Sequence, residues 1–275
     1  MPPQSGRHTL RSDEMATHQA RKRFGQHFLV DPHYIGRIVT AIAPEHGDNL
    51  IEIGPGLAAL TGPLIERAGH LTAIEIDRDL AAKLATEFPP QRLTLHVADA
   101  LIFDFAKLGP QMRVIGNLPY NISSPLLFHL AAFESQLRDL HVMLQREVVA
   151  RMIAAPGTAD YGRLTVMLQA RFAVTRLFTV PAGAFRPPPS VESAVARLVP
   201  LGVARPAIAD HALFARLVAL AFGQRRKTLR NAVAEICRAD TLEASGIDPG
   251  ARGETLTVAD FVRLTAALAA QSSVR

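Results

Sequence analysis

The stretch Leu50-Ile51-Glu52-Ile53-Gly54-Pro55-Gly56-Leu57-Ala58-Ala59 decides the fold. Its first four residues predict a short buried strand, and the glycines with Ala59 predict a tight turn that opens a helix. Such a turn lets a ligand approach the backbone, so we expect Gly54 and Gly56 to line a cofactor site. Taken alone, the pattern fits a dinucleotide site, an S-adenosylmethionine (SAM) site or an ordinary strand-to-helix turn.

The pattern around this turn repeats along the first half of the chain. Short apolar runs lie at 71–76, 93–97, 113–115 and 140–144, and later ones at 174–180 and 194–199. Helix-like stretches separate several of them, for example 57–68 and 79–87. Buried strands that alternate with helices predict an α/β fold of the Rossmann-like type, with a mostly parallel sheet covered on both faces.

The chain changes character after Pro200. Residues 209–222, 228–238 and 257–270 carry helical periodicity without strand signals. We therefore expect three parts: a disordered basic tail over 1–20, an α/β domain over 21–203 and a small all-helical domain over 204–275.

Composition narrows the possible classes of protein. The chain has 275 residues, with 30 Lys plus Arg against 25 Asp plus Glu, which gives a net charge of +5. This balance favours a nucleic-acid partner only mildly. The single cysteine, Cys237, excludes an internal disulfide framework and a cysteine-rich zinc site. No apolar run reaches the length of a membrane span and no signal peptide is visible, so we expect a cytoplasmic protein with no membrane partner. Separately, we expect no metal and a monomer.

Acidic residues follow the second and third strands. Glu75 and Asp77 stand about 20 residues after the glycine turn, where a carboxylate binds ribose hydroxyls. Alternation along the strand turns only one of them into the cleft, and we assign the ribose to Glu75 and a helix cap or a solvated position to Asp77. Asp99, after the third strand, is placed to accept from an adenine amine; a helix-capping aspartate is the alternative.

The fourth strand ends in Asn117-Leu118-Pro119-Tyr120, the most specific motif of the chain. The amino group of a nucleobase is a poor nucleophile because its lone pair is delocalised into the ring. The Asn117 side-chain oxygen and the Leu118 carbonyl can accept its two N–H bonds and draw it out of conjugation, and Pro119 fixes the backbone between them and Tyr120. Tyr120 offers a flat face for a flipped base, a role that needs its ring rather than its hydroxyl. No general base is required.

A basic cluster follows the first C-terminal helix, with Arg225, Arg226, Lys227 and Arg230. At helical spacing Arg226 and Arg230 share one face. A solvated basic turn is one interpretation. The other is an RNA-docking element, since one base pocket cannot select its target from a large RNA and phosphate contacts are the usual supplement.

With these motifs in place, the chain resembles the small-subunit ribosomal RNA adenine N6,N6-dimethyltransferases from about residue 21 to its C-terminus. Five motifs carry the resemblance in the family's order: 24–29 (FGQHFL), 52–56 (EIGPG), 117–125 (NLPYNISSP), 185–193 (FRPPPSVES) and 224–231 (QRRKTLRN).

The resemblance implies a seven-stranded SAM-dependent methyltransferase core followed by a small helical domain. It implies that the residues contacting SAM are His27, Leu29, Gly54, Glu75, Asp99 and Asn117. Phe185 would stack on the target base opposite Tyr120. The implied partner is 16S rRNA in the immature small subunit, where two adjacent adenosines of the 3′-terminal hairpin loop each receive two methyl groups.

The sequence departs from the family at three positions. His27 stands where the family often has Asn, and Ser190 and Glu192 where it often has Lys and Asp. Three alternatives remain open: a large-subunit rRNA adenine methyltransferase of the macrolide-resistance type, a ribosome-assembly factor for which methylation is secondary, and an NAD-dependent oxidoreductase. The last leaves Asn117–Tyr120 unexplained.

Overall fold

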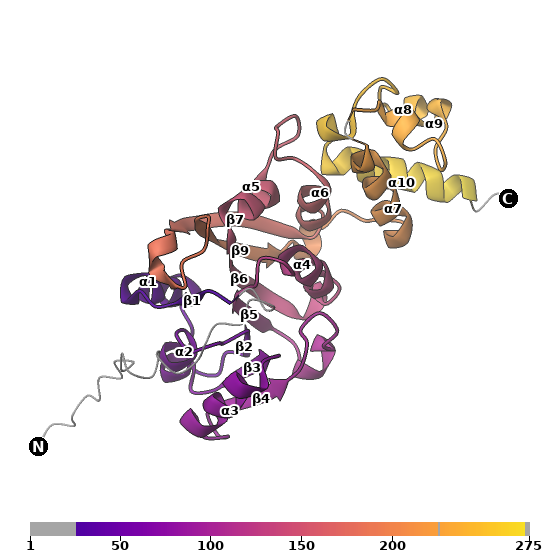
Figure 1. Cartoon of the computed structure of the whole chain (residues 1–275). Coiled ribbons are helices and arrows are strands. Elements are labelled where there is room, and N and C mark those ends of the chain that lie inside the picture. The colour runs from indigo at the N-terminus through magenta and orange to yellow at the C-terminus, as the bar shows by residue number, and fades with distance from the viewer. Residues whose placement is uncertain (1–25, 225, 273–275) are drawn as a thin grey trace, which may run out of the picture.

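We describe a computed structural model of the chain over residues 26–224 and 226–272, shown in Figure 1. The tail expected over 1–20 lies outside the described residues. A seven-stranded sheet forms the centre of the fold. Its strands are β2 (Leu50–Ile53), β3 (Leu71–Glu75), β4 (Leu93–Val97), β5 (Met112–Asn117), β6 (Leu137–Gln145), β7 (Phe172–Val180) and β9 (Ser193–Pro200).

The strands lie in the order β4-β3-β2-β5-β6-β9-β7. The first five of these are mutually parallel, and β9 runs antiparallel to both β6 and β7. The predicted Rossmann-like, mostly parallel sheet is confirmed. The order reverses direction at β2, whose Ile53 lies opposite Ile74 on one side and Gly116 on the other. The carboxyl ends of β2, β3 and β5 therefore meet at one edge, which is where ligands bind in such sheets.

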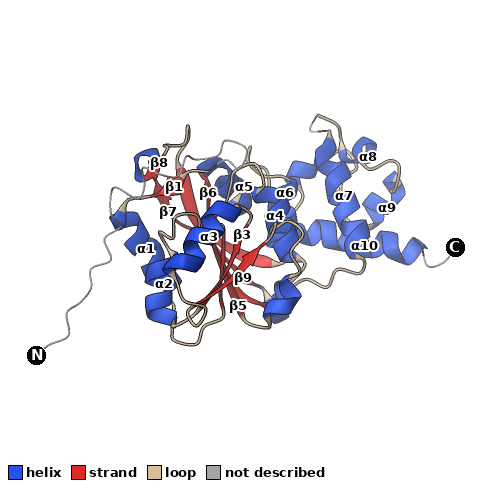
Figure 2. Ribbon diagram, turned by 60° about the horizontal axis from the view of Figure 1, so that its bottom comes forward, coloured by secondary structure: helices blue, strands red, loops and turns tan. Residues whose placement is uncertain are grey.

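Helices cover both faces of this sheet, as Figure 2 shows. One face packs against α1 (Pro32–Ile42), α2 (Thr61–Ala68) and α3 (Arg78–Glu87). The other packs against α4 (Ser123–Ala131), α5 (Arg146–Ile153) and α6 (Arg163–Gln169). Neighbouring residues of one strand serve opposite cores, as Val114 and Ile115 do. The helix expected over 57–68 begins only at Thr61, because Ala58 has a φ of 63° and the preceding residues form a turn.

A second, two-stranded sheet was not predicted. It pairs β1 (Phe28–Leu29) with β8 (Phe185–Arg186) in antiparallel fashion, so that Leu29 lies opposite Phe185. The main-chain N–H of Val30 also donates to the Ala184 carbonyl at 2.9 Å. This small sheet fixes the segment before α1 against the loop that leads into β9.

Four helices follow the sheet: α7 (His211–Gly223), α8 (Leu229–Ala232), α9 (Ala239–Ala244) and α10 (Val258–Ser272). Asp210 caps α7, accepting from two main-chain N–H groups. The helix expected over 228–238 is mostly wrong, because the chain leaves the helical conformation at Val233, where φ is −106°. The core of this helical region includes Tyr161 and Val166, so it extends across the boundary expected at residue 203.

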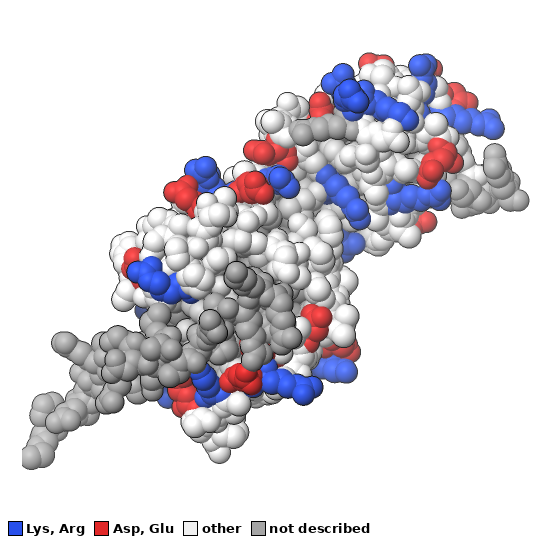
Figure 3. All heavy atoms as spheres, in the orientation of Figure 1, with Lys and Arg blue, Asp and Glu red and all other residues white. Residues whose placement is uncertain are grey.

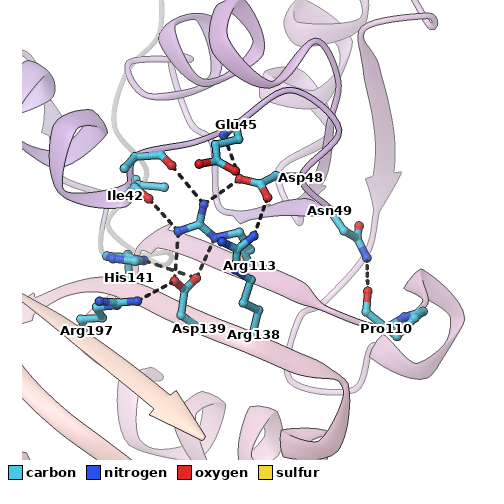
Figure 4. A network of polar contacts seen from close by, with 11 residues as sticks. Ile42, Glu45, Asp48, Asn49, Pro110, Arg113, Arg138, Asp139, His141 and Arg197 are labelled. Atoms are coloured by element: carbon cyan, nitrogen blue, oxygen red, sulfur yellow. Dashed lines mark hydrogen bonds and ion pairs between the residues drawn. The ribbon is translucent and has the colours of Figure 1, made fainter.

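The edge of the sheet opposite the glycine turn is closed by an ionic network around Arg113, at the start of β5 (Figure 4). Its guanidinium bonds Asp139 twice, at 3.0 Å each, and Asp48 at 2.7 Å. It also donates to the main-chain carbonyl of Ile42 at 2.6 Å, at the end of α1. Arg138 and Arg197 reach the same two carboxylates from outside. This network joins α1, β5 and β6 at the edge remote from the candidate site.

Candidate active site and cofactor pocket

A pocket opens at the carboxyl ends of β2, β3 and β5, where the strand order reverses. Its walls are the glycine turn, the loops after β3, β4 and β5, and residues 26–29 around β1. The predicted site residues that line it are His27, Leu29, Gly54, Gly56, Glu75, Asp99, Asn117, Leu118 and Tyr120. The topology thus brings together side chains from five separate segments of sequence.

The glycine turn has the backbone that only glycine adopts without strain. Gly54 and Gly56 have φ values of +68° and +60°. A Cβ on Gly56 would also lie 3.2 Å from two ring atoms of Phe28. The Gly56 N–H donates to Glu75 Oε2 at 3.2 Å, which ties the tip of the turn to the end of β3. The close approach of backbone to ligand expected here is therefore available.

Glu75 and Asp77 have different roles, but not by alternation, which puts residues two apart on the same face of a strand; here β3 ends at Glu75 and Asp77 is already the N-cap of α3. Glu75 is buried, lines the pocket and accepts from the Asp77 N–H at 2.9 Å. Its burial raises the pKa of the carboxyl, against the hydrogen bonds from the Asp77 and Gly56 N–H groups, which lower it. Asp77 does not line the pocket; it caps α3 by accepting from the Asp79 N–H at 3.0 Å. Of the two carboxylates, Glu75 is the one placed for a ligand.

Glu52 and Ile76 are among the pocket residues that the sequence analysis missed. Glu52, in β2, is buried and accepts from the Thr61 hydroxyl at 2.7 Å. Burial raises the pKa of Glu52 to about 7. Ile76, between the two acids after β3, keeps 46% of its surface exposed and gives the pocket an apolar wall. The sequence held a signal for each residue: Glu52 is a carboxylate inside an apolar run, and Ile76 is an apolar residue between two acids.

Asp99 both lines the pocket and stabilises its own turn. It lines the pocket after β4, and its Oδ1 accepts from the Leu101 N–H at 2.9 Å. Both interpretations of this residue therefore have support: it stabilises its own turn and it faces the pocket. Its contact with a cofactor stays a prediction.

The amide of Asn117 is held in one orientation. Its Nδ2 donates to the His27 carbonyl at 2.8 Å, so that nitrogen is already used within the protein. Gly116 makes room for the turn, since a Cβ there would lie 2.9 Å from the Ile53 carbonyl and 2.5 Å from Leu118 Cδ2. Leu118 is anchored by its N–H, which donates to the Met143 carbonyl at 3.1 Å. The start of the motif is therefore fixed by β2, by β6 and by the segment before α1.

Tyr120 is contacted from two sides. Its hydroxyl lies 2.7 Å from the Ser193 Oγ, and the His27 ring is stacked against it with 5.7 Å between centroids and 25° between planes. The His27 Nδ1 in turn lies 2.9 Å from the Pro187 carbonyl oxygen. Burial raises the pKa of Tyr120, so its hydroxyl is neutral at physiological pH. The His27 ring thus contacts Tyr120 and the proline loop, besides lining the pocket.

Phe185 is not where the resemblance placed it. Its side chain is 0% exposed, packs in the core beside Leu29 and Val180, and does not line the pocket. Pairing of β8 with β1 turns the ring inward. In this structure Phe185 offers no face to a base opposite Tyr120, and the expectation that it stacks there is corrected accordingly.

The predicted basic cluster lies on the surface of the helical region. Arg226, Lys227 and Arg230 are exposed, while Arg225 lies outside the described residues. Residues 226–228 are not helical, so the shared helix face expected for Arg226 and Arg230 is wrong. Among the described residues, no ion pair joins these three cations to a carboxylate; Glu235 pairs instead with Arg216 at 3.1 Å. Figure 3 shows basic side chains gathered over this end of the molecule, with acidic ones between them.

Over residues 26–224 and 226–272, none of the helices combines the length and the apolar character needed to span a membrane. Nor do three or more His, Cys, Asp or Glu side chains of this part of the chain form a group suited to a metal ion.

Comparison with known proteins finds close relatives over nearly the whole chain. The family described as ribosomal RNA adenine dimethylase matches residues 17–270. Ribosomal RNA small subunit methyltransferase A of Aromatoleum aromaticum is 59% identical over 94% of this chain and 97% of its own length. The protein of the same name from Thiobacillus denitrificans is 58% identical over 92% of this chain and 99% of its own.

Two solved structures resemble the whole fold. A dimethyladenosine transferase from Plasmodium falciparum superposes with a TM-score of 0.75 at 26% identity, covering 86% of this chain and 96% of that one. The 23S rRNA methyltransferase ErmE gives a TM-score of 0.65, also at 26% identity, over 88% of this chain and 99% of its own.

Proposed function

The chain belongs to the ribosomal RNA adenine dimethylase family, and from this premise we propose that it dimethylates N6 of two adjacent adenosines in the 3′-terminal hairpin loop of 16S rRNA. As a member it is a methyltransferase that takes its methyl groups from SAM. The small-subunit target is supported by relatives of that name at 59% and 58% identity, against 26% for the 23S enzyme ErmE. We further propose that it acts as a cytoplasmic monomer on the immature small subunit during biogenesis.

The pocket residues fit SAM. At the glycine turn a Cβ placed on Gly54 would meet nothing within 4 Å, so the turn leaves space beside its backbone, and Glu75 offers carboxylate oxygens to the ribose hydroxyls. Ile76 provides an apolar surface for the adenine, and Asp99 stands near it as an acceptor for the adenine amine. When bound, SAM supplies an electrophilic methyl group on a positively charged sulfur.

The chain's own contribution to the reaction lies at the end of β5. The observation that carries the proposal is the bond from Asn117 Nδ2 to the His27 carbonyl, because it leaves Oδ1 of the same amide as an acceptor. With the Leu118 carbonyl, Oδ1 can accept the two N–H bonds of the target amine and localise the nitrogen lone pair. The proton leaves to water, so no basic side chain is needed. Tyr120 supplies the face on which the extruded base rests.

Asn117→Ala tests this assignment. Loss of one preorganised hydrogen-bonding group lowers turnover by on the order of 10²-fold in comparable sites. We expect a loss of that size in dimethyladenosine formation on under-methylated small subunits with labelled SAM, while subunit association persists. The matched control is Asn49→Ala, since the Asn49 amide donates to the Leu108 and Pro110 carbonyls away from the pocket. An Asn117 variant that keeps most of the rate would contradict the proposal.

The same assay separates the other candidate functions. Label incorporated into large subunits instead would support the macrolide-resistance type of enzyme. If Asn117→Ala abolished methylation in cells but left small-subunit maturation normal, assembly would be the separate and dominant role.

We propose that the basic cluster docks the rRNA. Arg226, Lys227 and Arg230 are exposed and lack carboxylate partners among the described residues, which suits phosphate contacts. Neutralising all four cations, including Arg225, should lower the salt dependence of subunit binding by roughly 3–4 units of log–log slope. SAM affinity should stay unchanged, because the pocket lies in the sheet domain. An unaltered slope would return the cluster to a solvated surface.

A further inference from the structure

The hydroxyl of Tyr120 contacts Ser193, a residue that has no role in the reaction proposed above. Ser193 is the first residue of β9, is 0% exposed, and its Oγ lies 2.7 Å from the Tyr120 hydroxyl. Its backbone is paired on both sides, with Gln145 of β6 and with Val180 of β7. The hydroxyl group that meets Tyr120 therefore stands on one of the most firmly held positions of the sheet.

We propose that Ser193 is a positioning residue that fixes the plane of the Tyr120 ring over the pocket. The proposal deepens the function proposed above and rests on it. Tyr120 itself lies in the turn after β5, outside the sheet, where its ring has two rotatable bonds. A hydrogen bond at the tip of the ring, from a partner that cannot move, removes most of that freedom.

The stacked His27 ring supplies the second constraint. It lies along Tyr120 at 25° between planes, while its Nδ1 lies 2.9 Å from the Pro187 carbonyl oxygen. A ring held along one face by His27 and at its tip by Ser193 keeps one orientation before the substrate arrives. The target base then stacks on a ring that is already fixed in its orientation before binding. Because this preorganisation positions the base for reaction, it raises turnover and not only affinity.

A purely structural role is the competing explanation, because a buried hydroxyl without a partner is unfavourable wherever it occurs. The two explanations differ in the quantity that Ser193→Ala and Tyr120→Phe change: loss of a structural bond lowers the melting temperature and leaves kcat, whereas loss of a positioning bond lowers kcat. If Ser193 acts through Tyr120, each single variant removes the same hydrogen bond, and the double variant adds no further loss.

The experiment is this double-mutant cycle, followed by kcat and KM for small-subunit methylation. We expect each single variant to lower kcat by roughly five- to tenfold, the value of one neutral hydrogen bond, with KM changed less than about twofold. The double variant should match the single ones. Ser245→Ala is the matched control, because Ser245 is also buried and its Oγ donates to one carbonyl, that of Thr241 at 2.8 Å. That control should keep the wild-type kcat.

Three results would overturn the inference. Losses that multiply in the double variant would give the two hydroxyls separate roles. A Ser193→Ala protein with wild-type kcat and a lowered melting temperature would make the serine structural. NMR of the tyrosine rings tests positioning independently of activity, and with three tyrosines in the chain the Tyr120 signals can be assigned. Unchanged Tyr120 ring signals in Ser193→Ala would count against a positioning role. A wild-type protein that does not methylate small subunits would instead refute the proposed function.

Discussion

The two edges of the main sheet each bury a pair of carboxylates and surround them differently. At the amino edge, Asp48 and Asp139 are contacted by the guanidinium of Arg113, which is 5% exposed. At the carboxyl edge, Glu52 and Glu75 accept only from a hydroxyl and main-chain N–H groups. Among the described residues, no Lys, Arg or His lies within ion-pair distance of either glutamate.

The pKa values follow this difference. Burial alone would raise the pKa of Asp48, but the Glu45 N–H and the Arg113 guanidinium outweigh it and lower that pKa. At the other edge burial prevails and raises the pKa of both Glu52 and Glu75. The amino edge thus holds its own countercharge in the free protein, whereas neither glutamate of the carboxyl edge has one among the described residues. Buried acids without a cation indicate the site; buried acids with one indicate a structural joint.

The largest effect that this comparison predicts is on stability at the amino edge. Arg113→Met removes the buried donor of the Ile42 carbonyl and leaves Asp48 and Asp139 with only their outer cations, Arg138 and Arg197. Removing one partner of a buried ionic group costs about 3–5 kcal/mol. We expect the free energy of unfolding, measured by urea denaturation, to fall by that amount, while the SAM affinity of the folded protein is unchanged.

Arg138→Met is the matched control, since Arg138 bonds the same Asp48 but is 48% exposed. An exposed ion pair contributes about 0–1 kcal/mol, so this variant should lose little stability. Equal losses in the two variants, or a weakened SAM affinity in Arg113→Met, would contradict the separation of the two edges.

The fold was predictable because its pattern is local. Each parallel strand is a short apolar run bounded by a helix, and the carboxyl ends of parallel strands meet at one edge. Hence the glycine turn, Glu75, Asp99 and Asn117 were placed in one pocket from spacing alone. The helix expected over 228–238 failed because the chain leaves the helical conformation at Val233; at its start, Leu229 and Arg230 donate their N–H groups to the 249–251 loop, a contact with no signal in the local sequence.

The rest depended on contacts between distant segments. Pairing of β1 with β8 has no local signal, and it is this pairing that buries Phe185. The partners of Tyr120 are likewise remote in sequence, at His27 and Ser193. Glu52 was missed because a single acid in an apolar strand shows its importance only when its burial is known.

The second prediction concerns the stability cost of Glu52. In the unfolded chain its pKa is the ordinary 4.5, and in the folded protein it is about 7. Between pH 4.5 and about pH 7 the unfolded state releases a proton that the folded state retains. The free energy of unfolding therefore falls as the pH rises through this range. Above pH 7 it stays at the lower value. Glu52→Gln removes this titration. At one pKa unit per about 1.4 kcal/mol, it should stabilise the free protein by up to about 3 kcal/mol at pH 8 and by almost nothing at pH 4.

Denaturation of both proteins at the two pH values measures this difference, and the comparison cancels the titration of groups that do not interact with Glu52; Glu75 does interact, because its charge contributes to the raised pKa of Glu52. A gain of equal size at pH 4 and pH 8 would mean that Gln merely packs better. A loss at pH 8 would mean that Glu52 is ionised and stabilised in the free protein, which would end the contrast between the two edges.

The smallest expected effect is on SAM binding by Glu75→Gln. The substitution keeps one oxygen, which can still accept from the Gly56 N–H and hold the turn, while the bond from the Asp77 N–H to the second oxygen is lost. It replaces charge-assisted bonds to the ribose with neutral ones, a difference of about 1.4 kcal/mol, or tenfold in affinity. Calorimetry with SAM measures it, with Asp104→Asn as the control, because Asp104 caps the Ala106 N–H outside the pocket. An unchanged affinity would take the ribose away from Glu75. It would point to Asp77, whose carboxylate would then have to leave its position as the cap of α3 to reach the ligand.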